Sequence, residues 1–177
     1  MQVQPSRRLG FTVIELLVTI AIAAIVMGLA VPSFNTAIKN NRLTAQVNMF
    51  IGALNLARSE AIKRNYNVAI CRSNDGVTCV NLDDWAQGWL VFGDQNNNGI
   101  FDPGEAPPLR IQDGAKPQIT MTRTAGTVTS LISYKPTGMN GKTGTIKVCD
   151  DRVEAVGKSI VFVTTGRVQV KSNQSCP

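Results

Sequence analysis

Histidine is absent from this 177-residue chain, and charged and aromatic residues are scarce, at 17% and 6%. Without histidine, the chain lacks the commonest general base and the commonest metal ligand of proteins. It also contains neither the G-x-S-x-G turn of serine hydrolases nor a phosphate-binding glycine loop. These absences argue against a membrane-anchored hydrolase or a zinc enzyme, and we expect the chain not to be an enzyme.

Cysteine occurs four times, and no two cysteines are spaced as C-x-x-C. The absence of this spacing disfavours a metal-thiolate cluster. An even count beside an export-type N-terminus favours disulfide bonds formed in an oxidising compartment. Of the three pairings that four cysteines allow, we favour Cys71 with Cys79 and Cys149 with Cys176, since each bond then closes a loop within its own region.

The net charge of +6 is unevenly distributed along the chain. Residues 71–120 carry three basic and seven acidic side chains, whereas residues 121–177 carry eight basic and three acidic ones. A basic C-terminal half can face a polyanion, although such a stretch is more often an ordinary solvated surface.

One long hydrophobic run extends from Phe11 to Val31. As a helix, its 21 residues span about 31 Å, enough to cross the hydrocarbon core of a bilayer. Arg7 and Arg8 precede the run, so the positive-inside rule places the N-terminus in the cytoplasm and the rest of the chain across the membrane. A secretory signal peptide would have its small-residue cleavage site after the apolar stretch. Here Gly10 precedes the stretch, so we expect the run to be retained.

Glu15 is the only charged residue in this run. An acidic residue at the centre of a membrane-spanning helix costs about 2.5–3.5 kcal/mol, and less near an end. A carboxylate kept there needs a positively charged partner, unless the segment is a plain signal anchor with an incidental acid. Glu15 lies four residues after Phe11, one helical turn away on the same face.

The stretch "GFTVIELLVTIAIAAIVMGLAVPSF" resembles the class III signal and N-terminal helix of type IV pilins and type II secretion pseudopilins. The resemblance implies cleavage between Gly10 and Phe11 by a prepilin peptidase, followed by N-methylation of Phe11. It also implies that Glu15 neutralises the N-terminal amine of a neighbouring subunit during filament assembly. Residues 1–10 are then a leader peptide, and residues 11–31 are a transmembrane and assembly helix.

Residues 32–65 are expected to continue this helix beyond Pro32 with an amphipathic face. Six apolar residues recur there at spacings of three and four, as one face of a helix requires. They are Leu43, Val47, Phe50, Leu54, Ala57 and Ala61. The pattern does not persist beyond three heptads, so packing against a sheet is favoured over a coiled coil.

Short β-like segments separated by Gly, Pro, Asn and Asp occupy the rest of the chain. They are residues 66–71, 88–92, 108–112, 118–123, 129–134, 144–149, 159–165 and 166–171, and the last two form a hairpin. We therefore predict an α+β, type IV pilin-like fold, with the long N-terminal helix packed on an antiparallel β-sheet. Residues 66–177 form its β-rich periplasmic domain. Trp85 and Trp89 are expected in the core rather than at a ligand-stacking surface, because tryptophan is usually highly buried.

Two further pieces, "NLARSEAIKRN" and "GWLVFGDQNNNG", resemble the GspH/FimT group of minor pseudopilins and minor pilins. With the N-terminal signal, the resemblance covers about residues 7–112 and is diffuse afterwards. It implies a low-copy subunit at or near a filament tip, which helps to initiate or cap a type IV pilus or a type II secretion pseudopilus. The basic C-terminal half favours the pilus. The implied partners are other pilins, the prepilin peptidase and the bacterial inner membrane.

Residues 94–105, "DQNNNGIFDPGE", match the spacing of a calcium-binding loop. Side chains with oxygen atoms fall at loop positions one, three, five, nine and twelve: Asp94, Asn96, Asn98, Asp102 and Glu105. Pro103 and the flanking strands depart from the pattern. The alternative is a long polar turn in which Asn and Gly supply left-handed conformations. If the loop binds calcium we expect weak affinity, and the sequence suggests no other cofactor.

The C-terminal hairpin contains a candidate DNA-binding strand. In "GRVQVK", alternation places Arg167, Gln169 and Lys171 on one face and two valines on the other. Some FimT-type pilins resemble DNA receptors for natural transformation and have a G-R-x-R pattern here, but Gln169 replaces the second arginine. Nonspecific contact with double-stranded DNA is one interpretation, and a charged edge strand that prevents aggregation is the other. Further lysines whose faces the sequence does not fix are Lys142, Lys147 and Lys158.

Overall fold

The computed structural model describes residues 10–81, 84–102, 104–115, 118–127, 129–152 and 156–176. Of the expected leader, residues 1–10, only Gly10 is therefore described, and Pro103 of the candidate calcium loop lies outside the described residues. The chain divides into two compact units, Met1–Asn40 and Asn41–Pro177.

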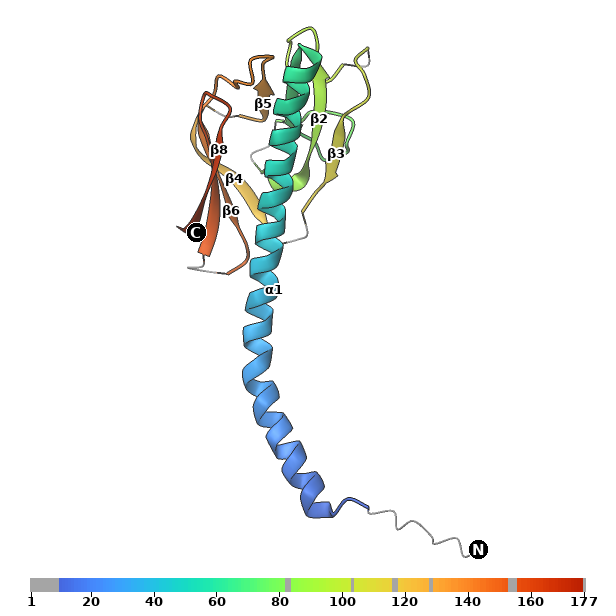
Figure 1. Cartoon of the computed structure of the whole chain (residues 1–177), viewed down its shortest axis with the longest axis vertical. Helices are drawn as coiled ribbons and strands as arrows, with labels where there is room; N and C mark the ends of the chain where they lie inside the picture. Colours follow the sequence, from blue (N-terminus) through green and yellow to red (C-terminus); the bar gives the residue numbers. More distant parts are fainter. Residues whose placement is uncertain are drawn as a thin grey trace, which may run out of the picture. The chain divides into compact units, whose positions relative to one another are not determined.

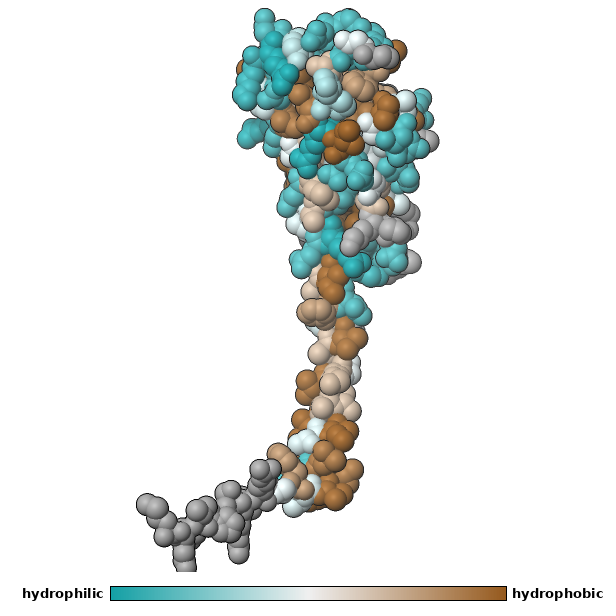
Figure 2. All heavy atoms as spheres, turned by 90° about the vertical axis from the view of Figure 1, so that its right-hand side faces the viewer, coloured by the Kyte–Doolittle hydropathy of each residue, from teal (hydrophilic) through white to brown (hydrophobic). Residues whose placement is uncertain are grey.

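Helix α1 extends from Val13 to Arg64 and is continuous through position 32. In the first unit its apolar side chains are exposed, among them Leu17 at 59% and Leu29 at 75%. Figure 2 shows that hydrophobic residues predominate along this stretch, with paler and a few hydrophilic ones between them. By length and composition, α1 is the one helix among the described residues that can cross a membrane.

Among its described residues, the second unit contains eight strands and a short 3-10 helix, η1, at Trp85–Gln87. The strands are β1 Asn67–Arg72, β2 Gly88–Asp94, β3 Arg110–Asp113, β4 Thr120–Gly126, β5 Leu131–Tyr134, β6 Gly144–Cys149, β7 Val156–Phe162 and β8 Val168–Ser175. Each strand segment expected from the sequence overlaps one of these. The predicted α+β class, with a long N-terminal helix and antiparallel strands, is therefore confirmed.

These strands form two antiparallel sheets rather than one (Figure 1). Sheet A has the order β3-β2-β1-β5, and sheet B has the order β4-β6-β7-β8. The chain thus leaves sheet B after β4, adds β5 to the edge of sheet A beside β1, and returns to sheet B with β6. Strand patterns in a sequence are local, whereas this exchange depends on pairing between distant segments, so the sequence did not predict it.

The amphipathic half of α1 supplies the centre of the core. All six of its predicted apolar positions are buried, with exposures of 2% or less. Phe50 makes edge-to-face contacts with Trp85 and Trp89, at ring-centroid distances of 5.1 and 5.0 Å, and with Phe162 at 6.5 Å. Both tryptophans are fully buried, which confirms their expected core positions. One hydrophobic core therefore joins the helix to both sheets.

A second, smaller cluster covers the other face of sheet A. It comprises Ala69, Cys71, Leu90 and Phe92, with Cys79, Phe101 and Leu131 packed against it. As a result, β2 is buried along its whole length.

Two disulfide bonds join strands to neighbouring segments. Cys71 is bonded to Cys79, with 5.6 Å between their Cα atoms, and Cys149 is bonded to Cys176, with 5.9 Å. This is the pairing favoured from the sequence. The first bond ties β1 to the loop that follows it, and the second ties the end of β6 to the end of β8.

Candidate functional site

The predicted cleavage site lies in a segment without regular secondary structure before helix α1. Gly10 and Phe11 are exposed, and the helix begins at Val13. The side chain of Phe11 is 83% exposed. A peptide bond between Gly10 and Phe11 is therefore accessible to a second protein without unfolding the helix.

Glu15 has a local role that the sequence analysis missed. The backbone N–H of Thr12 donates to Oε2 of Glu15 at 3.4 Å, and the backbone N–H of Glu15 donates to Oγ1 of Thr12 at 3.3 Å. This reciprocal pair is a capping box, which satisfies two backbone donors at the start of α1. The T-x-x-E spacing of residues 12–15 was readable in the sequence.

Four of the five candidate calcium ligands lie in the connection between β2 and β3, and the fifth, Asp94, is the last residue of β2. Asn96 and Asn98 donate from their amide nitrogens to Oδ2 of Asp102, at 3.0 and 2.7 Å. These two hydrogen bonds lower the pKa of Asp102. Glu105 accepts hydrogen bonds from the backbone N–H groups of Gln95 at 3.2 Å and Asp102 at 3.3 Å. The loop thus brings most of the predicted set together through direct contacts.

Of the candidate DNA-binding residues, Gln169 and Lys171 lie on β8, an edge strand of sheet B, whereas Arg167 directly precedes β8 and Lys158 lies on β7. In the β7–β8 register, Lys171 pairs with Ser159, and Val170 pairs with the buried Ile160. Directly opposite residues share a face. Gln169 and Lys171 therefore lie on the face of sheet B that points away from Ile160, and both are exposed.

The structure directs the side chains of Lys158 on β7 and Lys147 on β6 to different places. Lys158 donates from Nζ to Oγ1 of Thr44 on α1 at 2.7 Å, so its ammonium is directed to the helix and not to the face of Lys171. Lys147 on β6 instead pairs with Ser159 and shares that face, and its Nζ donates to the backbone oxygen of Ser175 on β8 at 2.9 Å. A row of Lys147, Ser159 and Lys171 thus crosses β6, β7 and β8. Lys147 joins the basic residues of β8, whereas Lys158 does not.

The turn before β8 is held by contacts from distant segments. Arg58 of α1 donates to the backbone oxygens of Thr165 and Gly166, both at 3.4 Å. Gly166 has a φ of 78°, and a Cβ atom there would lie 2.2 Å from the backbone oxygen of Gly138. Arg167, the next residue, is exposed. The sequence analysis missed Arg58, because only the tertiary fold brings α1 to this turn.

The loop closed by the Cys71–Cys79 bond contains a strongly hydrogen-bonded carboxylate. Asp75 accepts from the hydroxyl and backbone N–H of Thr78 at 2.6 and 2.8 Å, from the N–H of Val77 at 2.9 Å and from the hydroxyl of Ser73 at 3.0 Å. These bonds, those from Thr78 first, hold the pKa of Asp75 well below its usual range. The loop is therefore ordered around an ionised acid.

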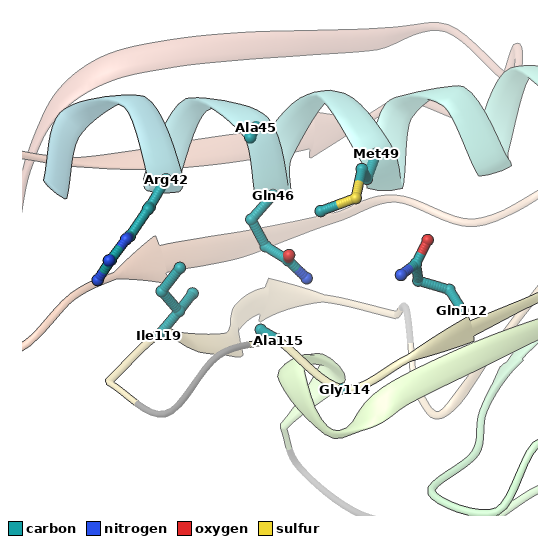
Figure 3. Close-up of a pocket in the computed structure, with 8 residues that line it drawn as sticks. All are labelled: Arg42, Ala45, Gln46, Met49, Gln112, Gly114, Ala115 and Ile119. Atoms are coloured by element: carbon teal, nitrogen blue, oxygen red, sulfur yellow. The ribbon is translucent and has the colours of Figure 1, made fainter. Parts of the chain in front are cut away.

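A small cavity of about 200 Å³ lies between α1 and the connection from β3 to β4. In Figure 3, Arg42, Gln46 and Met49 project from the helix toward it, and Ile119 and Gln112 lie opposite. The described residues that line it provide one guanidinium and two amides, but no carboxylate, hydroxyl or thiol. This lining offers no nucleophile or general base.

Comparison with protein-family models gives two matches. The model of the type II transport protein GspH matches residues 46–170, and the model of the prokaryotic N-terminal methylation motif matches residues 5–31. Among curated proteins, the pilin-like protein PilA1 of Thermus thermophilus is 35% identical over 100 residues, which are 55% of this chain and 56% of PilA1. The chain thus spans about half the length of that relative.

Among solved structures, two crystal forms of the type IV minor pilin FimU of Pseudomonas aeruginosa are similar to this chain. Their TM-scores are 0.58 and 0.53, each at 23% sequence identity. Each likeness covers 78% of this chain, with 98% and 99% of the FimU chains. At this identity the likeness shows the fold. The match to the GspH model extends over more than half of the sequence, and the chain therefore belongs to the family of the type II transport protein GspH, with a type IV pilin-like fold.

Proposed function

We propose that this chain is a low-copy subunit that helps to initiate or cap a type IV pilus or a type II secretion pseudopilus, at or near the filament tip. The observation that carries the proposal is the exposed apolar stretch of α1 in the first unit, which contains a single carboxylate, Glu15. Exposed apolar surface of this extent needs lipid or other subunits to cover it. In this proposal the inner membrane covers it before assembly, and neighbouring pilins cover it afterwards.

Gly10 supports cleavage by a prepilin peptidase. Its φ lies outside the left-handed region, and a Cβ atom there would meet no atom within 4 Å. The fold of this chain therefore does not require a glycine at position 10. A requirement imposed by a second protein that recognises the segment explains its presence, and cleavage there leaves Phe11 with a free amine that is then methylated.

Glu15 has two separable roles in this proposal. Its hydrogen bonds with Thr12 cap the helix, and its negative charge neutralises the amine of Phe11 in a neighbouring subunit. A capping box accepts glutamine as well as glutamate at the third helical position. Glu15→Gln therefore keeps the cap and removes the charge, whereas Thr12→Ala removes the hydroxyl of the cap and keeps the charge.

The matched pair Glu15→Gln and Thr12→Ala tests the proposal in cells that lack the wild-type gene. Each variant is measured by immunoblot in the membrane fraction and in sheared filaments. We expect Glu15→Gln to reach the membrane normally and to fall at least tenfold in filaments, while Thr12→Ala enters filaments. Equal incorporation of Glu15→Gln and wild type would show that the charge has no role in assembly. Immunogold label distributed along filaments, rather than at their ends, would contradict the tip position.

The orientation of the chain follows from the same features. Arg7 and Arg8 favour a cytoplasmic N-terminus, so α1 crosses the inner membrane once and the second unit lies in the periplasm. The two disulfide bonds support this location, since such bonds persist in oxidising compartments. On assembly, the second unit moves with the filament tip to the cell exterior.

A second candidate function is that of a DNA receptor in natural transformation. The observation that favours it is the set of three basic residues around β8: Arg167, Lys147 and Lys171. Lys147 and Lys171 share one face of sheet B, and Arg167 follows a turn anchored by Arg58. Phosphate contacts from three cations give nonspecific binding that weakens steeply with salt. Gln169 adds an amide that can donate to phosphate.

An electrophoretic mobility shift with double-stranded DNA at low salt tests this second function. We expect Lys171→Ala and Arg167→Ala each to weaken binding and to reduce the salt slope by about 0.9. Lys158→Ala removes the same charge as Lys171→Ala, but from an ammonium that donates to Thr44, and we expect little effect. Unchanged mobility of DNA at high micromolar wild-type protein would remove the receptor function, without affecting the assembly proposal.

A further inference from the structure

The connection between β2 and β3 is folded around its own polar side chains. The backbone N–H of Gly99 donates to Oδ2 of Asp94 at 3.1 Å. The N–H of Asn98 donates to Oδ1 of Asn96 at 3.1 Å, and the N–H of Ile100 donates to Oδ1 of Asn98 at 2.8 Å. Each of these side chains therefore accepts a hydrogen bond from a backbone N–H within the loop, while Asn96 and Asn98 remain exposed.

The second half of the loop closes on the first. The amides of Asn96 and Asn98 both reach Oδ2 of Asp102, and the carboxylate of Glu105 reaches back to the N–H groups of Gln95 and Asp102. Hydrogen bonds thus connect residues that are up to ten positions apart in sequence. The side chains that make these contacts provide carboxylate and amide groups only.

This arrangement leaves one carboxylate oxygen of Asp94 without a hydrogen-bond donor among the described residues. Asp94 is only 1% exposed, and the oxygen in question is Oδ1. Because Oδ2 of the same carboxylate accepts from Gly99 within the loop, the carboxylate is directed into the loop. A buried carboxylate oxygen without a donor or a positive charge is costly. A cation beside Oδ1 would remove that cost.

The loop is also fixed to the body of the second unit. The ring of Phe101 packs on Phe92 of β2 at a centroid distance of 5.4 Å. Gly99 has a φ of 73°, and a Cβ atom there would lie 2.6 Å from a methyl group of Leu131. Asn97 also has a left-handed φ, of 59°, and its side chain accepts a hydrogen bond from Asn67. Little ordering of the backbone is therefore needed when a cation binds.

The geometry points to a calcium site in residues 94–105. Its oxygen ligands are Oδ1 of Asp94, the side-chain oxygens of Asn96, Asn98, Asp102 and Glu105, and the backbone oxygen of Ile100. Each amide oxygen has two lone pairs, so Asn96 and Asn98 can keep their backbone hydrogen bonds and also face a cation. In the bound state the cation replaces the hydrogen bonds from their amide nitrogens to Asp102.

The ligand types select calcium over other metals. No group of three or more His, Cys, Asp or Glu side chains among the described residues is arranged to hold a metal ion by itself. The site therefore depends on amide and backbone oxygens, which suit a hard cation with six to eight ligands at variable geometry. Magnesium needs a tighter octahedral set and keeps more water. With three carboxylates and two amides, we expect a Kd of about 10⁻⁴–10⁻³ M, typical of extracellular calcium modules.

Isothermal titration calorimetry of the full-length chain in detergent, first stripped with a chelator, tests this site. Calcium should give saturable heat in the expected range, and magnesium at the same concentrations should not. Asp94→Asn and Glu105→Gln should each weaken calcium binding at least tenfold. Asp113→Asn is the matched control, since this exposed acid on β3 lies outside the loop, and it should bind as wild type does.

Thermal unfolding gives a second readout that distinguishes loss of binding from loss of folding. Without calcium, Asp94→Asn should unfold at or above the wild-type temperature, because the substitution removes an uncompensated buried charge. With calcium, the wild-type unfolding temperature should rise and that of Asp94→Asn should not. An absence of saturable heat up to about 10 mM calcium, a concentration well above this range of Kd, would overturn the site. Unchanged binding by both loop variants would do the same. Either result leaves the assembly proposal intact.

Discussion

Helix α1 contains two apolar stretches that differ in what covers them. Leu17 and Leu29 in the first unit are 59% and 75% exposed, whereas Leu43 and Leu54 in the second unit are 2% and 0% exposed. The first stretch is apolar on all sides, and the second is apolar on one face only. The comparison teaches that the same apolar residue types have two uses in one helix. In the second stretch they form the core of the chain itself, and in the first they are available for contact with lipid or other proteins.

A matched pair of leucine substitutions tests this difference and carries the largest expected effect. Leu54→Ala removes a fully buried side chain and should lower the free energy of unfolding by about 2–5 kcal/mol. Leu17→Ala removes an exposed one and should change it by less than about 0.5 kcal/mol. Denaturant unfolding in detergent, followed by near-ultraviolet circular dichroism of the two tryptophans, measures both. Similar losses for the two variants would contradict the proposed division of the helix.

A pair of glycine substitutions sharpens the comparison within the second unit. Gly166 and Gly141 both have left-handed φ angles, of 78° and 66°, but a Cβ atom at Gly141 would meet nothing within 4 Å. Gly141→Ala should therefore cost only the conformational penalty, about 1–2 kcal/mol. Gly166→Ala should cost about 1–3 kcal/mol more, because its Cβ atom would collide with the backbone oxygen of Gly138. Equal unfolding temperatures would show that the hairpin turn is not held against Gly138.

The smallest expected effect concerns Asp75. Its pKa is lower in the folded chain than in the unfolded chain, so its contribution to stability is fully present above its usual pKa and is lost progressively as the pH falls from there toward the lower folded value. The unfolding temperature of the wild type should therefore fall more between pH 5 and pH 3, two values that bracket the usual pKa of about 3.9, than that of Asp75→Asn. Parallel pH profiles would show that the hydrogen bonds around Asp75 do not stabilise the loop. Helical signal from the first unit should not change in either protein.

Much of this fold could be predicted because its signals are local. The helical spacing from Leu43 to Ala61 gave the buried face of α1, and alternation and turn residues gave eight strands. The pairing of the four cysteines was predicted because each favoured bond closes a loop within its own region of the sequence. These patterns depend on a few neighbouring residues, whose geometry the chain itself imposes.

The features that escaped prediction depend on distant contacts. The division into two sheets depends on β5 pairing with β1, and the anchored turn at Gly166 depends on Arg58 of α1. The direction of Lys158 depends on the register of β7, which shifts between Gly157 and Ser159. Among the features that were missed, the capping box of Thr12 and Glu15 is the exception, because its T-x-x-E spacing is a local signal in the sequence.

The measurement that tests the central claim most directly is intact-mass spectrometry of the chain extracted from membranes of cells with an active prepilin peptidase. The chain should begin at Phe11, with one methyl group on its amine. This result is expected because an exposed Gly10–Phe11 bond precedes an uncovered apolar stretch whose only acid, Glu15, lies one helical turn after Phe11. A chain that still begins at Met1 in those cells would contradict the account.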